Sequence, residues 1–317
     1  METTRFEIII VSKCFYDLSK YDFSFKDITI YDIESEEFEN YITRLNPKIK
    51  GANMSFINEL KSEIHNKFEK KYAIVKNDPT KNYSYNDLHK VYVVLLIIFP
   101  SDFQIENIIH FINENGFIQR SSMSILEKRY TGEYPGKLII SRDSYIYEIN
   151  EFSRLVFDRI LPNTYIGLAI ENYITSFNAS HIQFQYITLC TALECTINGS
   201  NELNYRLKRT IAVLCAEENG EGVFIYNNLN KLYSLRSKIV HGEEYKVEKV
   251  EEYLKHLISM VSRTIIELLI HNIETNLKLN EITTRYGYGE RHKLSENWKH
   301  FELNPLTIIE TNWGEVK

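Results

Sequence analysis

The chain has 317 residues, more than a single hydrophobic core usually organises, so we expect two domains. Hydrophobic residues make up 44% and charged residues 25%, and 12 Gly with 6 Pro are too few for a low-complexity chain, which favours globular structure. The formal net charge of -6 excludes a global basic field that would bind nucleic acid non-specifically, so any contact with RNA has to be local.

Cysteine spacing and hydropathy indicate the cellular compartment. Four cysteines have neither CxxC spacing nor the density of a disulfide scaffold, which predicts reduced thiols at Cys14, Cys190, Cys195 and Cys215. The longest apolar run, residues 91–100, has about half the length that a membrane-spanning helix needs. The acidic N-terminus is also unlike a signal peptide, so we expect a cytoplasmic protein without membrane contact.

The beginning of the chain has the pattern of a mixed α/β domain. Runs of β-branched and aromatic residues predict strands at residues 6–11 and 25–33. Apolar residues at helical spacing predict helices at residues 35–41 and 53–72. These helices are expected to cover the sheet that the strands form.

Three further patterns are expected to complete this domain. The unbroken apolar run at residues 91–99 predicts a strand that is buried on both faces. Residues 103–115 have a helical period that ends at a glycine, which predicts a helix directly after that strand. Residues 138–141 and 145–147 have the composition of a short hairpin.

From about residue 148 helical periodicity replaces the β-branched clusters. Gly, Asn and Pro divide this half into six predicted helices, at residues 151–161, 165–177, 181–197, 202–216, 223–240 and 247–277. The predicted fold class is therefore α+β, with a mixed α/β domain at 1–147, an all-α bundle at 148–279 and an aperiodic extension at 280–317.

The stretch LYSLRSKIVHGE at residues 232–243 contains the residues with the clearest chemistry. Arg236 precedes His241 by four intervening residues, and Gly242 can end the helix. Cleavage of RNA needs a group that moves protons and a positive charge on the phosphate. Histidine transfers protons near neutral pH, and the planar fork of arginine matches phosphate oxygens.

The spacing of this pair is unfavourable on a regular helix. Residues five apart differ by roughly 140° around the axis, so Arg236 and His241 would not share a face. Two arrangements bring them together: the helix unwinds just before Gly242, or the two residues come from different protomers across a cleft. Ser237 lies four residues before His241 and shares its face, so its hydroxyl is a candidate supporting group.

The segment LRSKIVHG resembles the R-X4-6-H signature of the HEPN superfamily, and more narrowly the motif of the ApeA-like HEPN family of bacterial anti-phage proteins. TALECTI at residues 191–197 and ELNYRLKRTIAVLC at residues 202–215 resemble the helices that precede the motif in that family. The resemblance covers roughly residues 150–275 and leaves out the N-terminal half.

The resemblance implies a helical bundle that forms a homodimer, with both copies of the motif in one cleft. It also implies an endoribonuclease that needs no metal or other cofactor and leaves a 2′,3′-cyclic phosphate. By position, Arg236 and His241 match the catalytic pair of the family. The implied setting is abortive infection: host RNA, tRNA included, is cleaved when a phage-derived trigger is sensed, and the N-terminal domain senses or restrains.

Two supporting residues follow from the same comparison. Many relatives have Asn, Asp or His where this chain has Ser237, which leaves that position a secondary role. Glu194 matches an acidic position from which a carboxylate orients the catalytic pair. A structural ion pair with Arg206 or Arg209 is the alternative interpretation of Glu194.

Basic residues near the motif are candidates for RNA contact. Arg206, Lys208 and Arg209 lie on one predicted helix, and Lys238 lies within the motif itself. A solvated polar face explains the first three equally well. Lys238, with His241, also suits the carbonyl end of a helix electrostatically. Residues 285–293 interleave basic and aromatic side chains, for which an ordinary turn is the simpler interpretation.

Two rival functions remain open at this point. The first is a catalytically inert HEPN module that binds protein or nucleotide. The second places a small-molecule site in the N-terminal half and leaves only dimerisation to the helices. The sequence contains no HExxH motif and no phosphate-binding Gly-rich loop, and its histidines are scattered, so no metal site is expected.

Overall fold

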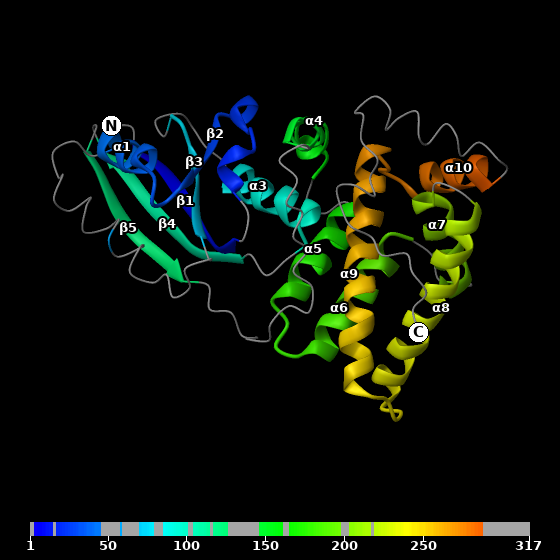
Figure 1. The fold of residues 1–317 in the computed structure, drawn as a ribbon. Helices are drawn as coiled ribbons and strands as arrows, with labels where there is room; N and C mark the ends of the chain where they lie inside the picture. The colour runs from blue at the N-terminus through cyan, green and yellow to red at the C-terminus, as the bar shows by residue number, and fades with distance from the viewer. Residues whose placement is uncertain are drawn as a thin grey trace. The chain divides into compact units, whose positions relative to one another are not determined.

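The computed structural model describes residues 3–14, 17–45, 58, 70–78, 85–100, 104–114, 117–125, 146–160, 165–197, 203–216 and 219–287. They belong to two compact units, of which the first contains a β-sheet and the second is helical (Figure 1). Along the chain the main division falls between Arg154 and Leu155, a little beyond the predicted boundary at residue 147. Residues 96–101 also belong to the second unit.

The sheet of the first unit is antiparallel throughout, in the order β2-β3-β1-β4-β5. Its strands are β1 (Thr3–Cys14), β2 (Ile28–Asp32), β3 (Lys70–Lys76), β4 (Gln104–Glu114) and β5 (Phe117–Ile125). Short 3₁₀ turns, η1 (Leu18–Lys20) and η2 (Ser24–Lys26), lie between β1 and β2. The strand predicted at residues 6–11 is confirmed within β1, and the one predicted at residues 25–33 is confirmed over β2.

Helix α1 (Glu36–Leu45) packs its apolar stripe against one face of this sheet and confirms the helix predicted at residues 35–41. The stripe and the central strand share one core cluster, whose members include Phe38, Tyr41, Ile42, Phe6, Ile8 and Ile10. Ile9 and Val11, which point to the opposite face of β1, are also fully buried. Burial on both faces explains why this strand reads as a continuous apolar run.

Two predicted elements of the first unit have the wrong type. Residues 91–99 were expected as a strand, but residues 91–98 belong to helix α3 (Tyr85–Ile98). Every residue from 91 to 100 is buried, and an apolar run without a polar face does not distinguish a buried helix from a buried strand. Residues 103–115 were expected as a helix, but residues 104–114 form β4.

The error at β4 has a structural cause. Ile105, Ile108, Ile109 and Ile112 have helical spacing, yet they lie in a strand. The pairing with β1 shifts register between Ile10 and Val11, which face Asn107 and Ile105, so one extra residue bulges from β4. A bulge interrupts the alternation of period two by which a strand is recognised.

Two other predictions fall partly outside the described residues. The helix predicted at residues 53–72 is wrong at its end, because Lys70, Lys71 and Tyr72 are in strand β3. Residues 138–145 of the predicted hairpin are not among the described ones, and residues 146–147 begin helix α4 (Ile146–Val156) instead. Helix α4 belongs to the first unit as far as Arg154. Nη2 of Arg154 lies 2.6 Å from Oδ2 of Asp22.

The helices of the second unit follow the sequence pattern closely. After the 3₁₀ turn η4 (Phe157–Arg159) come α5 (Tyr165–Phe177), α6 (Ile182–Cys195), α7 (Leu203–Cys215), α8 (Asn219–His241), α9 (Val247–Ile270) and α10 (Asn276–Gly287). Helix α9 is buried continuously from Leu257 to Ile270 and contacts α5, α6, α7 and α8. It therefore forms the centre of this unit (Figure 1).

The single helix predicted at residues 247–277 is wrong at its end, because α9 stops at Ile270 and α10 begins at Asn276. Asn272 adopts a left-handed φ of 49°, and the amide of Ile273 donates to the carbonyl of Leu268 at 2.9 Å, which closes the helix. The aperiodic extension expected from residue 280 is also wrong at its start. Residues 280–287 belong to α10, where Tyr286 packs against Val213 of α7. Residues 288–317 lie outside the described residues.

The architecture of the described residues is thus α+β, as predicted. Among them, no helix combines the length and the apolar character that crossing a lipid bilayer requires.

Candidate functional site

The motif singled out in the sequence lies at the carboxyl end of the long helix α8. The helix ends in a left-handed glycine, Gly242, with a φ of 68°. The amide of Gly242 donates to the carbonyl of Ile239 at 3.4 Å, and that of Glu243 to Lys238 at 2.9 Å. This hydrogen-bond pattern is a Schellman motif, and it keeps α8 helical through His241. The unwinding before Gly242 that would have rotated His241 is therefore absent.

Arg236 is half-buried and faces α6. Its Nη2 lies 3.4 Å from Oε1 of Glu194, in the last turn of α6, and the two side chains are 30% and 22% exposed. Within the described residues the buried Nε of Arg236 has no hydrogen-bond partner. Glu194 thus pairs with Arg236, and not with Arg206 or Arg209, the structural alternative considered from the sequence.

Two tyrosines fix α6 against α8 beside this ion pair. The hydroxyl of Tyr186 on α6 donates to the carbonyl of Leu232 on α8 at 2.9 Å. In return, Tyr233 on α8 donates to the carbonyl of Cys190 on α6 at 3.2 Å. Because the two bonds run in opposite directions between the same helices, they hold the backbones that carry Glu194 and Arg236 in register.

His241 lies elsewhere on α8. It is the last helical residue and is exposed, and no hydrogen bond or ion pair joins it to another described side chain. Five residues along a continuous helix separate it from Arg236 by roughly 140°. Ser237, half-buried, lies one turn before His241 and on its side of the helix. Within one chain the structure brings Arg236 to Glu194 and leaves His241 on another face.

The basic residues of α7 have separate surroundings. Lys208 is buried, donates to Oδ1 of Asn230 on α8 and lies 5.3 Å from the centroid of the Tyr226 ring. That position makes Lys208 a structural link between α7 and α8. Arg209 is exposed, and its guanidinium approaches Gly287 at the end of α10. Arg206 is half-buried on the same helix.

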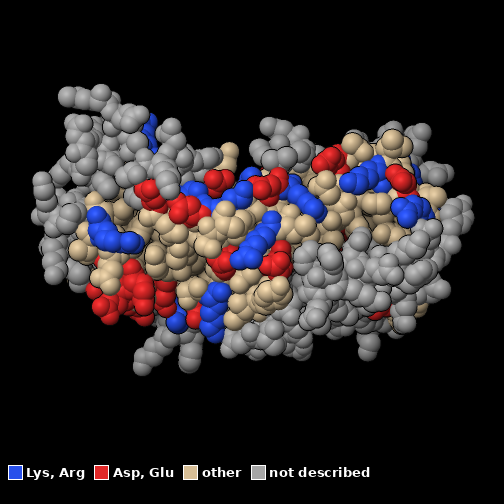
Figure 2. Space-filling view, turned by 90° about the horizontal axis from the view of Figure 1, so that it is seen from above, with Lys and Arg blue, Asp and Glu red and all other residues tan. Residues whose placement is uncertain are grey.

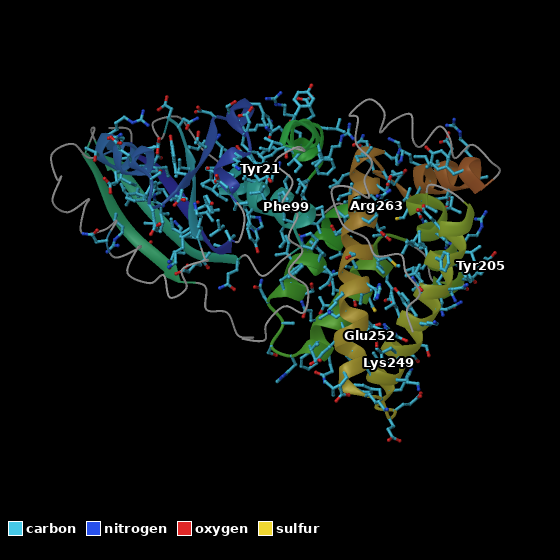
Figure 3. The ribbon with its side chains drawn as sticks, viewed as in Figure 1. Tyr21, Phe99, Tyr205, Lys249, Glu252 and Arg263 are labelled. Atoms are coloured by element: carbon cyan, nitrogen blue, oxygen red, sulfur yellow. The ribbon has the colours of Figure 1, made fainter. Side chains whose placement is uncertain are left out.

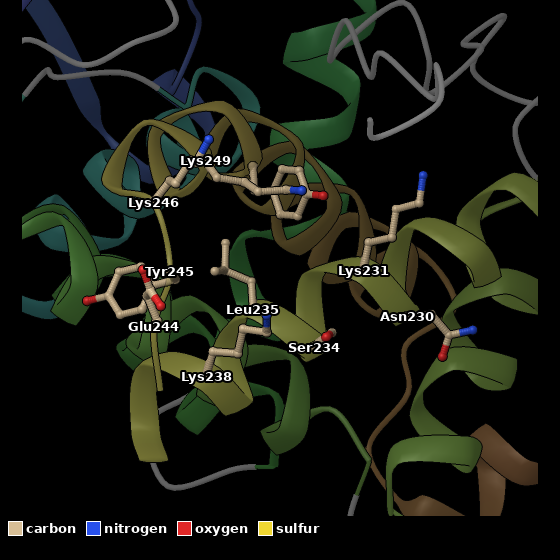
Figure 4. Close-up of a pocket in the computed structure, with 10 residues that line it drawn as sticks. Asn230, Lys231, Ser234, Leu235, Lys238, Glu244, Tyr245, Lys246 and Lys249 are labelled. Carbon is tan, nitrogen blue, oxygen red and sulfur yellow. The ribbon is translucent and has the colours of Figure 1, made fainter. Parts of the chain in front are cut away.

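Lys238 is exposed and lines a pocket that sequence reasoning missed. The pocket lies between α8, the loop after Gly242 and the first turns of α9 (Figure 4). Three further lysines line it: Lys231, Lys246 and Lys249. Lys231 and Lys238 are seven residues apart on one helix face, a spacing that was readable in the sequence. The link to Lys246 and Lys249 depends on how α9 packs beside α8.

Charges of both signs occur together on the face of the described residues that Figure 2 shows. On the face in Figure 2, Lys and Arg side chains alternate with Asp and Glu, in keeping with the modest net charge. No group of three or more His, Cys, Asp or Glu side chains in the described ranges is arranged to hold a metal ion.

Comparisons with models of known protein families, with curated proteins and with solved structures find no match.

Proposed function

We propose that the helical unit is a HEPN domain of the ApeA-like type and that it acts as a metal-independent endoribonuclease. In this proposal Arg236 and His241 are the catalytic pair. The observation that carries it concerns α8. This helix contains the half-buried Arg236, which pairs with Glu194 of α6, and it ends in the exposed imidazole of His241. The order of α6, α7 and α8 around the motif agrees with the resemblance seen in the sequence.

The chemistry would be transesterification within the RNA strand. The imidazole of His241 takes the proton from a 2′-hydroxyl, whose oxygen then attacks the adjacent phosphorus. The bond from phosphorus to the 5′-oxygen breaks, and that oxygen receives the proton. The products are a 2′,3′-cyclic phosphate and a free 5′-hydroxyl. Arg236 stabilises the additional negative charge on the phosphate oxygens as the bond forms.

The proposal requires two copies of the chain. Because Arg236 and His241 diverge on α8, one phosphate reaches both only if His241 comes from one copy and Arg236 from the other. A two-fold dimer presents the same surface from each copy and creates two such sites. Two exposed valines, Val240 within the motif at 46% and Val247 after it at 44%, would be covered in such an interface.

We place this activity in anti-phage defence, with host RNA, tRNA among it, as the substrate. A phage-derived trigger would act through the N-terminal unit, which senses the infection or restrains the nuclease. The RNA contacts assigned to Arg206, Arg209 and Lys238 belong to the same proposal. Lys238 supports it best, since it is exposed one turn before His241.

A catalytically inert HEPN module is the second candidate. One observation favours it: the guanidinium of Arg236 is already engaged with Glu194, and His241 lies on another face of the same chain. Such a module would bind protein or nucleotide through the same surface and leave RNA intact.

The test compares the parent protein with Arg236→Ala and His241→Ala. Each is incubated with total RNA in EDTA, and the fragment ends are analysed. The proposal expects fragments with 2′,3′-cyclic phosphates from the parent only. Expression in bacteria covers a nuclease that needs a trigger, since growth arrest should then disappear in His241→Ala. Equal behaviour of all three proteins in both assays favours the inert module.

A further inference from the structure

The pocket beside the motif is a concave site of about 670 Å³. That volume is within the range of small-molecule and cofactor sites. Its walls come from one face of α8, from the loop after Gly242 and from the start of α9 (Figure 4). Neither Arg236 nor His241 lines it, so it is distinct from the proposed catalytic pair.

Positive charge dominates this pocket. Its lining contains four lysines and a single acidic residue, Glu244, which amounts to a formal charge of +3 in a chain whose net charge is -6. The four lysines are Lys231, Lys238, Lys246 and Lys249. Such a concentration of one sign in a concave surface attracts anions.

The backbone adds to this field. Lys246 is the N-cap residue of α9, and no side chain caps that helix end. The first amides of a helix lack partners within the helix, and the aligned peptide dipoles leave a partial positive charge there. Figure 3 shows Lys249 at this end of the 24-residue helix α9. A phosphate group near Lys246 and Lys249 would meet both the ammonium groups and the helix end.

The floor of the pocket is apolar and aromatic. Leu235 and Tyr253 are 4% and 3% exposed, and the Nζ of Lys249 lies 5.2 Å from the centroid of the Tyr253 ring. Tyr245 contributes a second, half-buried ring. The partly exposed ring of Tyr245 suits a nucleobase that stacks while its phosphate is held by lysines, and the buried Tyr253 ring positions Lys249. Glu244 can accept from a base amino group or a ribose hydroxyl.

We infer that this pocket binds a nucleotide, with its phosphate at Lys246 and Lys249 and its base against the ring of Tyr245. The same chemistry has two sources: a free nucleotide, or one nucleotide of an RNA strand. The inference does not depend on catalysis. If the ligand is part of a strand, Lys238 lies in the pocket wall one turn before His241 on α8, so the strand leads from the pocket towards the motif.

Direct binding measurements test this inference on the full chain carrying His241→Ala, so that no cleavage interferes. The probes are a fluorescent single-stranded RNA oligomer and, separately, ATP. Lys249→Glu is compared with Lys255→Glu, which reverses an exposed charge on the same helix outside the pocket. We expect Lys249→Glu to weaken binding about tenfold, as loss of a charged contact does, and Lys255→Glu to change it less than about twofold.

The two sources give different results. A free-nucleotide site binds ATP in a Lys249-dependent way, and RNA competes poorly. A strand site binds RNA in a Lys249-dependent way, and Lys249→Ala lowers the slope of log affinity against log salt by about 1. The inference is overturned if neither probe binds, if Lys249→Glu has no effect, or if both variants weaken binding equally.

Cleavage assays on the same residues separate this inference from the nuclease proposal. Lys249→Glu is introduced into the parent as well, and its cleavage is measured beside that of the parent. If the parent neither cleaves RNA nor arrests growth, while binding is intact and depends on Lys249, only the nuclease proposal is overturned. If the parent cleaves RNA but Lys249→Glu does not weaken binding, only the inference about the pocket is overturned.

Discussion

At the scale of single residues, the centre of the helical unit contains a row of ionisable groups along α9. Nη2 of Arg263 lies 2.7 Å from Oε1 of Glu267, whose other oxygen lies 3.5 Å from Nε2 of His271. The Arg263 and Glu267 side chains are only 2% and 1% exposed. Arg263 also donates to the carbonyl of Cys215 at the end of α7, at 3.5 Å. One buried carboxylate therefore compensates the guanidinium that links α9 to α7.

Removing that carboxylate should be costly. Glu267→Ala removes the carboxylate that lies 2.7 Å from the buried guanidinium of Arg263, and breaking such a buried pair costs about 3–5 kcal/mol. Urea denaturation should therefore show a much lower midpoint than for the parent. Glu252→Ala is the control, since it removes an exposed carboxylate from the first half of the same helix and should change stability by less than about 0.5 kcal/mol. Similar midpoints for both variants would show that Glu267 does not stabilise the core.

The environment of the candidate site also depends on residues from other helices. The residue types of Arg236 and His241 were sufficient to suggest phosphodiester chemistry from the sequence. Their surroundings were not predictable, because the Glu194 pair joins α6 to α8 across an inter-helix contact. Sequence reasoning left four candidate partners for Glu194, namely Arg236, His241, Arg206 and Arg209, and packing selected Arg236. The burial of Lys208 was missed for the same reason.

At the scale of elements, the end of α8 depends on the backbone of Gly242. Its φ of 68° is left-handed, and a Cβ at that position would meet nothing within 4 Å. A substitution there therefore has a conformational cost without a clash. The loop that follows connects the motif helix to the lysines at the start of α9, so the geometry of this turn positions both sites.

We expect Gly242→Ala to lower the free energy of unfolding by about 1–2 kcal/mol, the cost of a left-handed alanine. Gly242→Asn should cost less, because asparagine adopts this conformation more readily. Chemical denaturation of the three proteins checks the order. An alanine variant as stable as the parent would contradict the left-handed helix end.

Prediction of the elements succeeded where a helix has one apolar and one polar face. The expected helix at residues 165–177 has the bounds of α5, and α6, α7 and α8 were placed within a few residues of their ends. It failed in α3, whose apolar run is buried from Val91 onwards, and in β4, where a bulge disturbs alternation, whereas α9 was recognised because its first half has an exposed face. Periodicity reports which faces meet solvent, so it carries little information about an element that solvent does not reach.

At the scale of the whole molecule, the nuclease proposal makes a prediction about assembly. If each site takes Arg236 from one copy and His241 from the other, a mixed dimer of Arg236→Ala and His241→Ala chains has one intact site. Random exchange makes half of the dimers mixed, so about a quarter of the parental cleavage should return.

Mixing the two inactive proteins under conditions that allow subunit exchange, followed by the RNA cleavage assay, measures this recovery. Each variant alone is the matched control. If the mixture stays as inactive as its components while mass measurement shows mixed dimers, the residues do not act across an interface. A parent that is monomeric at the assay concentration would contradict the dimeric site directly.

The amino-acid sequence by itself determined the α+β class, the helical second half, the glycine that ends α8 and the Arg-His spacing on it. Each of these features depends only on residues that are close together in the chain. It can therefore be predicted from local periodicity and from the backbone preferences of single residues. Tertiary structure decided the type of α3 and β4, the partner of Arg236, the divergence of His241 and the joining of lysines from α8 and α9 in one pocket. Each of these depends on which surfaces meet, and contacts between distant segments leave no regular spacing in the chain.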